Sequence, residues 1–381
     1  MKVSFVYNAQ LHQVFHSLPI ALELAAHHHD IEVHVAAADP RALAFARRLA
    51  ERYGLAAPVC FIGLRRPWVA RIAARLTGAL APAKKITLGA NLAYFRRLDA
   101  LVVPERTSLA LRRLGLPGST RLIYTGHGAG DRAMAVAPEI REFDFVLNPG
   151  PKLEARRRAL GLIRPGAYAT GIYAKFDWLF RQGAAARPLF ANDRPTVLYS
   201  PHFDPALSSW PVAGRQMLDW FAANPRFNLV FAPHVRLFEP AHASKLRAFR
   251  DYASLPHMLV DLGSERSIDM TYTLGADAYL GDVSSQVAEF LVRPRPCVFL
   301  NPRRTHWRGD PNYRFWQLGP VVEDLAHLGE ALDDAFASHP EYVPAQEAYF
   351  EESFGGAGRA PSARRGADEI AKFLRHGAEA P

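Results

Sequence analysis

Residues 276–300, ADAYLGDVSSQVAEFLVRPRPCVFL, begin and end with short apolar runs, 276–280 and 296–300. Runs of this length, rich in β-branched and aromatic residues, are typical of buried β-strands. The Ser284-Ser285 pair between them is typical of a helix start, where Ser is a favoured N-cap. A strand, a helix and a second strand in this order predict a right-handed βαβ unit with parallel strands.

The same alternation of apolar runs and helical stretches extends over the whole chain. Further strands are expected at 2–7, 31–36, 59–63, 99–103, 121–125, 143–147, 196–200, 228–232 and 258–261. The polar, Ala- and Pro-rich stretch 181–195 interrupts the series and predicts a linker. We therefore expect an α/β protein with two Rossmann-like domains of mainly parallel strands, facing each other across a cleft. The expected divisions are an acceptor-side domain at 1–180, the linker at 181–195, a nucleotide-donor domain at 196–355, and a closing helix and tail at 356–381.

Composition excludes several classes of protein. The chain has 381 residues, of which 49% are hydrophobic and 22% charged, as in ordinary globular proteins and unlike disordered or fibrous chains. No stretch contains the roughly 18 uninterrupted apolar residues of a membrane span. Cys60 and Cys297 both lie in apolar runs, so we expect two buried thiols in a reducing compartment. These features predict a cytoplasmic protein.

The chain is basic, with 46 Lys and Arg against 37 Asp and Glu and a formal charge of +9. Arg is spread along the whole chain, and no DNA- or RNA-binding motif accompanies it, so nucleic acid is not an expected partner. The stretch 64–86 is the one place where positive charge is concentrated locally. It predicts either a helix that contacts an anionic membrane peripherally, on the inner face of the cell membrane, or a solvated helix that covers its own sheet.

The first candidate site is the turn 126–132, GHGAGDR, which follows the apolar run 121–125. Glycines at a strand-to-helix turn let backbone N–H groups approach an anion, so Gly128 is a candidate phosphate contact. Asp131 stands where a dinucleotide-binding fingerprint would need Gly. His127, held between two glycines, is well placed as a general base, although it could equally cap the turn. Arg132 is a further candidate for donor phosphates.

The second candidate site follows the run 228–232. Pro233 ends that run, which places His234 on a loop at the cleft, and Arg236 could bind a phosphate through two hydrogen bonds. Arg266 is a further candidate for donor phosphates. His202, after the run 196–200, could also line the cleft.

The third candidate site is 281–289, GDVSSQVAE. Ser284 and Ser285, with backbone N–H groups at a helix start, could bind phosphate, and Glu289 one turn later could bind a ribose. Asp282 and the serines could instead only cap the helix. No DxD pair, HExxH, Cys/His zinc spacing, GxxxxGK[ST] or GxSxG occurs, so no metal ion or cofactor is expected.

His127-Gly128, Pro233-His234 and Asp282-x-Ser284-Ser285, in this order, resemble the motifs of the CDP-glycerol glycerophosphotransferase family of teichoic-acid and capsule synthesis. The resemblance implies a GT-B fold and a transferase with a nucleotide-activated donor, CDP-glycerol or a related CDP-alditol. It implies a polymer or lipid-linked acceptor. His127 would be the catalytic base and His234 would stabilise charge on the donor phosphates.

Two alternatives remain open. A Ser-containing phosphate turn followed by a ribose-binding Glu, as at Ser284 and Glu289, also resembles UDP-N-acetylglucosamine 2-epimerases and UDP-sugar GT-B glycosyltransferases. A non-catalytic basic protein that binds membranes or anionic polymers is the second alternative.

Overall fold

The computed structural model describes residues 1–8, 10–70, 80–130, 133–182, 188–238, 243–284 and 286–377. The chain divides into two compact units. Unit 1 comprises residues 1–129, 133–183 and 351–381, and unit 2 comprises residues 130–132 and 184–350.

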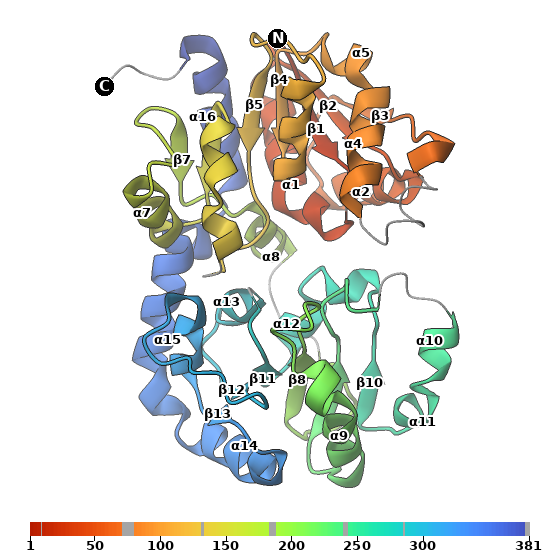
Figure 1. Cartoon of the computed structure of the whole chain (residues 1–381), viewed down its shortest axis with the longest axis vertical. Helices are drawn as coiled ribbons and strands as arrows, with labels where there is room; N and C mark the ends of the chain where they lie inside the picture. Colours follow the sequence, from red (N-terminus) through yellow and green to blue (C-terminus); the bar gives the residue numbers. More distant parts are fainter. Residues whose placement is uncertain are drawn as a thin grey trace. The chain divides into compact units, whose positions relative to one another are not determined.

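The sheet of unit 1 is parallel throughout, with the strand order β3-β2-β1-β4-β5-β6-β7 (Figure 1). Its central strands are buried on both faces, which explains their continuous apolar sequences. The strands are β1 Lys2–Tyr7, β2 Glu32–Ala37, β3 Val59–Gly63, β4 Ala100–Val103, β5 Arg121–Tyr124, β6 Phe145–Asn148 and β7 Tyr168–Thr170.

Helices connect these strands, and local signals set their ends. In α2, Pro40–Tyr53, the Asp39 carboxylate accepts the Arg41 N–H at 2.9 Å, and Gly54 ends the helix with φ of 70°. These are the expected N-cap and left-handed C-terminal conformations. The other helices are α1 His12–His27, α4 Leu80–Ala90, α5 Leu92–Phe95, α6 Ala110–Arg113, α7 Pro151–Ala159, α8 Asp177–Gln182 and α16 Ala363–His376, with 3₁₀ helices η1 Arg106–Leu109, η2 Ala133–Val136, η3 Pro138–Glu142, η4 Ala174–Phe176 and η8 Gly355–Gly358.

The C-terminal helix α16 is part of unit 1, where it packs along α1 (Figure 1). The Phe373 ring stacks on Phe145 of β6 with centroids 4.6 Å apart. The buried carboxylate of Asp177 accepts the backbone N–H groups of Ser362 and Ala363, each at 2.9 Å, and so caps the helix start. The end of the chain therefore completes the core that its first helix begins.

Unit 2 contains a second parallel sheet, with the strand order β10-β9-β8-β11-β12-β13. Its core is rich in aromatic side chains, among them Phe221, Phe231 and Phe249. The strands are β8 Thr196–Ser200, β9 Asn228–Phe231, β10 Met258–Val260, β11 Ala278–Gly281, β12 Cys297–Leu300 and β13 Val321–Val322. The helices are α9 Trp210–Ala223, α10 Ala243–Arg247, α11 Arg250–Ala253, α12 Thr271–Gly275, α13 Gln286–Phe290, α14 Leu328–Ala337 and α15 His339–Phe354, with 3₁₀ helices η5 Glu265–Ser267, η6 Pro311–Leu318 and η7 Leu325–His327. The last residues of α15, from 351 on, belong to unit 1.

The predicted α/β class with two parallel sheets is confirmed, and each predicted apolar run overlaps a strand. The prediction that both thiols are buried is wrong for Cys60. Cys297 is buried, but Cys60 is exposed because β3 is the edge strand of its sheet. Within the described part of the chain, no helix is both long and apolar enough to cross a membrane.

Candidate functional site

Polar side chains of unit 1 gather beyond the carboxyl ends of three neighbouring strands. His12 begins α1 after β1, Glu105 follows β4, and His127 follows β5. The ring centroids of His12 and His127 lie 5.6 Å apart, and those of His12 and His16 lie 6.3 Å apart. We call His12, His16, Glu105 and His127 the unit 1 cluster. Carboxyl ends of parallel strands are where open α/β sheets bind ligands.

The hydrogen bond of His127 determines which ring nitrogen is basic. Nδ1 lies 3.0 Å from the carbonyl oxygen of Pro104, which can only accept. The neutral ring therefore carries its proton on Nδ1 and leaves a lone pair on Nε2. Desolvation lowers the pKa of His127, outweighing the Pro104 hydrogen bond and the charge of Glu105, which raise it. His127 is thus neutral near pH 7 and, as an exposed residue, available as a base.

The glycines on either side of His127 are required by the backbone. Gly126 has φ of 63° and Gly128 has φ of 117°, conformations that side chains with a Cβ rarely adopt. This turn exposes the imidazole directly after a buried strand. Asp131 and Arg132, the other predicted residues of the turn, lie outside the described residues.

Glu105 is bound by neighbours that hold it ionised. Its carboxylate pairs with Lys84 at 2.6 and 2.8 Å and accepts from Gln13 at 2.7 Å and from the Thr107 hydroxyl at 3.0 Å. Burial raises the pKa of Glu105, but the Lys84 charge and the hydrogen bonds from Lys84 and Gln13 together lower it by more, so the net shift is downward. A carboxylate held in this way stays ionised and positions its neighbours, so it does not act as a proton donor.

His12 and His16 were not predicted from the sequence. They lie one helical turn apart at the start of α1, so the spacing His-x-x-x-His just after a strand was the available signal. Burial lowers the pKa of His16 well below its ordinary value, and the charges of Lys175 and His127 lower it further. The cluster therefore combines the neutral imidazoles of His16 and His127 with the Lys84–Glu105 ion pair.

In unit 2, the predicted residues follow four adjacent strands. His202 follows β8, His234 and Arg236 follow β9, Arg266 follows β10, and Ser284 follows β11. The structure brings His202 and His234 together, with ring centroids 5.6 Å apart. Arg266 is exposed, and its guanidinium carbon lies 5.0 Å from the centroid of the Tyr272 ring.

Both histidines of unit 2 have the opposite tautomer to His127. Nδ1 of His202 accepts the Asp204 N–H at 3.0 Å, and Nδ1 of His234 accepts the Arg236 N–H at 3.2 Å. Each neutral ring therefore carries its proton on Nε2, as a hydrogen-bond donor. His234 is partly exposed, whereas His202 is buried in the loop that Asp282 holds. We call this pair the donor histidines.

Phe203 connects the donor histidines to a cation. Its ring centroid lies 4.4 Å from that of His202 and 4.6 Å from that of His234. The guanidinium carbon of Arg236 lies 3.9 Å from the same ring, in cation–π contact. The sequence did not single out Phe203, whose ring contacts both imidazoles and the guanidinium.

Asp282 holds the loop that carries His202. Its Oδ2 accepts the backbone N–H groups of His202 and Ser209, each at 2.9 Å. The side chain is fully buried, and its Oδ1 has no hydrogen-bond partner among the described residues. Desolvation raises the pKa of Asp282 to about 6 despite these hydrogen bonds. Its role in the structure is to position the loop.

Ser284 and Glu289 are both buried. The Ser284 hydroxyl oxygen accepts the Gln286 N–H at 3.2 Å at the start of α13, as expected of a helix cap. Gln286 also accepts a hydrogen bond from the Ser200 hydroxyl at the end of β8. Ser285 lies outside the described residues.

The basic stretch 64–86 is described only in part, because residues 71–79 lie outside the described residues. Trp68 is 64% exposed. Lys84 is turned toward Glu105 and belongs with the unit 1 cluster. The other charged residues of the stretch that the structure describes, Arg65, Arg66 and Lys85, are exposed.

Comparison with known proteins identifies the fold. No protein-family model and no curated protein matches the sequence. Solved structures do match over the whole chain. The wall teichoic acid polymerase TagF, soaked with CDPG, has a TM-score of 0.61 and 13% identity, with 100% of this chain and 90% of that chain covered. The chain adopts the GT-B fold.

Two further structures agree in fold. The S. aureus MnaA–UDP structure has a TM-score of 0.63 and 12% identity and covers 100% of this chain and 98% of that one. The UDP-GlcNAc 2-epimerase from Neisseria meningitidis bound to UDP-GlcNAc has a TM-score of 0.57 and 15% identity, with 98% of this chain and 100% of that chain covered. At such identities the likeness establishes the fold alone.

Proposed function

We propose that the chain is a transferase that moves a group from a nucleotide-activated donor to an acceptor hydroxyl. The opposite tautomers of its histidines carry this proposal. His127 presents a basic Nε2, whereas His202 and His234 present Nε2–H donors. A base for an acceptor proton and donors for phosphate oxygens are the two groups that a metal-independent transfer requires.

In the proposed step, the acceptor oxygen forms a bond to the donor phosphorus that carries the glycerol. The bond from that phosphorus to the oxygen bridging it to CMP breaks, and CMP leaves with the electron pair. The acceptor proton passes to Nε2 of His127. The donor histidines and Arg236 stabilise the negative charge on the departing phosphate.

We further propose CDP-glycerol or a related CDP-alditol as the donor and a polymer or lipid-linked acceptor of the cell envelope. The order of His127-Gly128, Pro233-His234 and Asp282-x-Ser284-Ser285 supports this choice, as does the fold likeness to TagF. Gly128, Ser284 and Ser285 would bind donor phosphates, and Glu289 the ribose. Exposed Trp68 would contact the acceptor or an anionic membrane on the cytoplasmic side.

A sugar-nucleotide 2-epimerase is the second candidate, since the fold likeness extends equally to UDP-GlcNAc 2-epimerases. The buried Ser284 and Glu289 at the start of α13 suit a UDP donor as well as a CDP donor. An epimerase would consume UDP-GlcNAc without any added acceptor. A transferase would release its nucleotide at full rate only when an acceptor is present.

The test combines ligand binding with turnover. Thermal shift against CDP-glycerol, CDP-ribitol, CMP-sugars and UDP-sugars identifies the nucleotide, because a ligand of the folded state raises its stability. His127→Asn then tests the base. The Asn amide can still donate to the Pro104 carbonyl, but no lone pair replaces Nε2. We expect nucleotide release to fall by about 10²–10⁴-fold, the usual contribution of a general base, with donor binding retained.

His29→Gln, at an exposed histidine of the same unit, serves as the matched control and should keep full turnover. Wild-type nucleotide release by His127→Asn would refute the proposed base. Absence of turnover with every nucleotide donor, together with liposome flotation that His127→Asn leaves unchanged, would instead favour a non-catalytic binding protein.

A further inference from the structure

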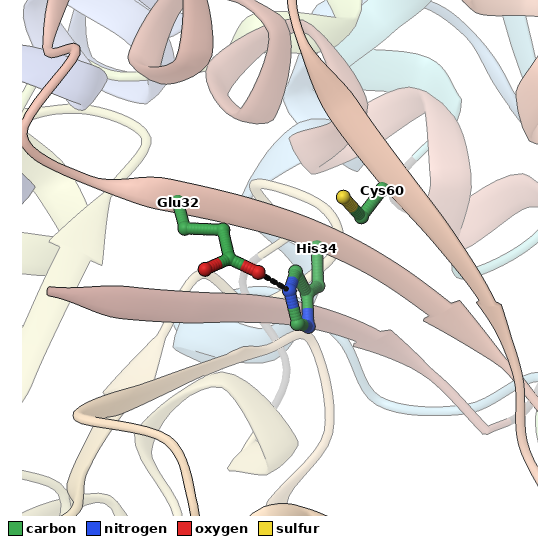
Figure 2. Close-up of side chains that lie close together, drawn as sticks. All are labelled: Glu32, His34 and Cys60. Atoms are coloured by element: carbon green, nitrogen blue, oxygen red, sulfur yellow. Dashed lines mark hydrogen bonds and ion pairs between the residues drawn. The ribbon is translucent and has the colours of Figure 1, made fainter.

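Three potential metal ligands lie together on the first sheet, away from the carboxyl ends where the unit 1 cluster gathers. Glu32 and His34 point to one face of β2 because they are two residues apart. Cys60 of the edge strand β3 pairs in register with His34. One ligand atom from each residue lies within 4.8 Å of the other two (Figure 2).

The hydrogen bonds of His34 leave one ring nitrogen facing a carboxylate. The Tyr94 hydroxyl donates to Ser4 Oγ at 3.1 Å, so its oxygen accepts from Nδ1 of His34 at 2.9 Å. Nε2 then lies 2.8 Å from Oε1 of Glu32 (Figure 2). In a neutral ring of this tautomer, Nε2 carries a lone pair, and a lone pair directed at a carboxylate is repelled. The position between the two atoms therefore requires a proton or a cation.

We propose that Glu32, His34 and Cys60 bind a Zn²⁺ ion through the carboxylate, Nε2 and the thiolate. Sulfur, imidazole nitrogen and carboxylate oxygen are the ligands that zinc prefers, at bond lengths of about 2.0–2.3 Å. Around a tetrahedral ion such ligands lie about 3.3–3.7 Å apart, so small side-chain movements close the site. A water completes the coordination, since Glu32 and Cys60 are both exposed.

The surroundings of the site fit this proposal. A zinc-bound histidine usually donates its other ring N–H to a neighbouring acceptor, which fixes the ring, and Tyr94 fills that role. Its ring lies nearly parallel to that of His34, at an interplanar angle of 10°. Lys2 competes with a metal ion for Glu32, because its ammonium lies 2.9 Å from the Glu32 carboxylate. That pair is about half exposed and occupies Oε2, whereas Oε1 faces His34.

A bound ion would join the edge strand to its neighbour by coordinate bonds in addition to the backbone ladder. The sequence did not predict such a site because its ligands do not follow a short Cys/His spacing. Helix α2 separates Cys60 from Glu32 and His34 in the sequence, and the parallel pairing of β2 with β3 brings the three residues together.

The experiment uses the full chain, stripped with a chelator and kept reduced, and titrates it with Zn²⁺ against a chromophoric chelator and with Co²⁺ by absorption. We expect one zinc per chain and a thiolate-to-cobalt charge-transfer band in the near ultraviolet. Cys60→Ser should abolish the band and weaken zinc binding at least 10-fold. Tyr94→Phe should weaken it about 10–100-fold, as loss of a ligand-orienting partner does.

His29→Gln controls for adventitious binding by the exposed histidines at the end of α1 and should leave the zinc affinity unchanged. The cobalt band of the unmodified chain needs no variant, so it tests the proposal even if a substitution impairs folding. Absence of stoichiometric zinc, absence of the thiolate band, or unchanged affinity in Cys60→Ser would each overturn the proposal.

Discussion

Asp282→Asn should make the stability of unit 2 less dependent on pH. The wild-type carboxylate accepts two backbone N–H groups through one oxygen, while desolvation raises its pKa from 3.8 to about 6. An amide oxygen can accept the same two bonds, but it cannot ionise. The substitution therefore keeps the loop contacts to His202 and Ser209 and removes the titration. The amide NH₂ that replaces the buried Oδ1 lacks a partner among the described residues, but its cost is the same at every pH.

The sign and size of the effect follow from the pKa. Between pH 4 and pH 6 the folded state holds a proton on Asp282 that the unfolded state has released, so wild-type stability falls as pH rises. A shift of about two units corresponds to about 3 kcal/mol, since each unit is worth about 1.36 kcal/mol. Because the unfolded carboxyl is already partly ionised at pH 4, the difference in unfolding free energy between the Asn variant and the wild type should change by about 2 kcal/mol in favour of Asn from pH 4 to pH 7.

Denaturant unfolding at several pH values, followed by tryptophan fluorescence, measures this difference. Four tryptophans report on unit 2, namely Trp210, Trp220, Trp307 and Trp316. Asp177, whose pKa burial also raises to about 6, titrates equally in both proteins and cancels. The exposed Asp193→Asn controls for the loss of one charge. A free-energy difference that stays constant from pH 4 to pH 7 would refute the reasoning.

Two further predictions concern packing and exposure. Gly150→Ala should destabilise unit 1 by about 1–3 kcal/mol in thermal unfolding, because a Cβ there would lie 2.3 Å from the Ser353 carbonyl oxygen. Gly118→Ala, where nothing lies within 4 Å, is the control and should unfold like the wild type. A thiol reagent should modify exposed Cys60 alone in the folded, metal-free chain. Burial raises the pKa of Cys297 to about 12, so a second thiol should react only in denaturant, and two fast thiols would contradict the structure.

The fold could be predicted from the sequence because its strands are buried on both faces. Such strands are continuous apolar runs, as in 196–200 and 296–300, and each run overlaps an observed strand. Two strands were missed, β7 with three residues and β13 with two. They are too short to carry a periodic pattern, and only the neighbouring strands define them.

The candidate site could be predicted only where its residues directly follow a strand. His127, His202 and His234 were found on this basis. Glu105 also follows a strand, but it was not found, because nothing in the sequence marks its pairing with Lys84. The histidine tautomers also depend on partners that only three-dimensional structure supplies, such as the Pro104 carbonyl.

The packing of α16 on α1 has a consequence for synthesis on the ribosome. Domains usually fold in the order in which they are translated. Here the first unit cannot close until Ala363–His376 has left the exit tunnel, whereas residues 184–350 are already complete. The later-translated unit should therefore finish folding first, and during that interval the nascent first unit exposes the face of α1 that α16 later covers. A chain released before Ala363 would leave the Asp177 carboxylate without the helix start that it caps and should be a substrate for chaperones or proteases.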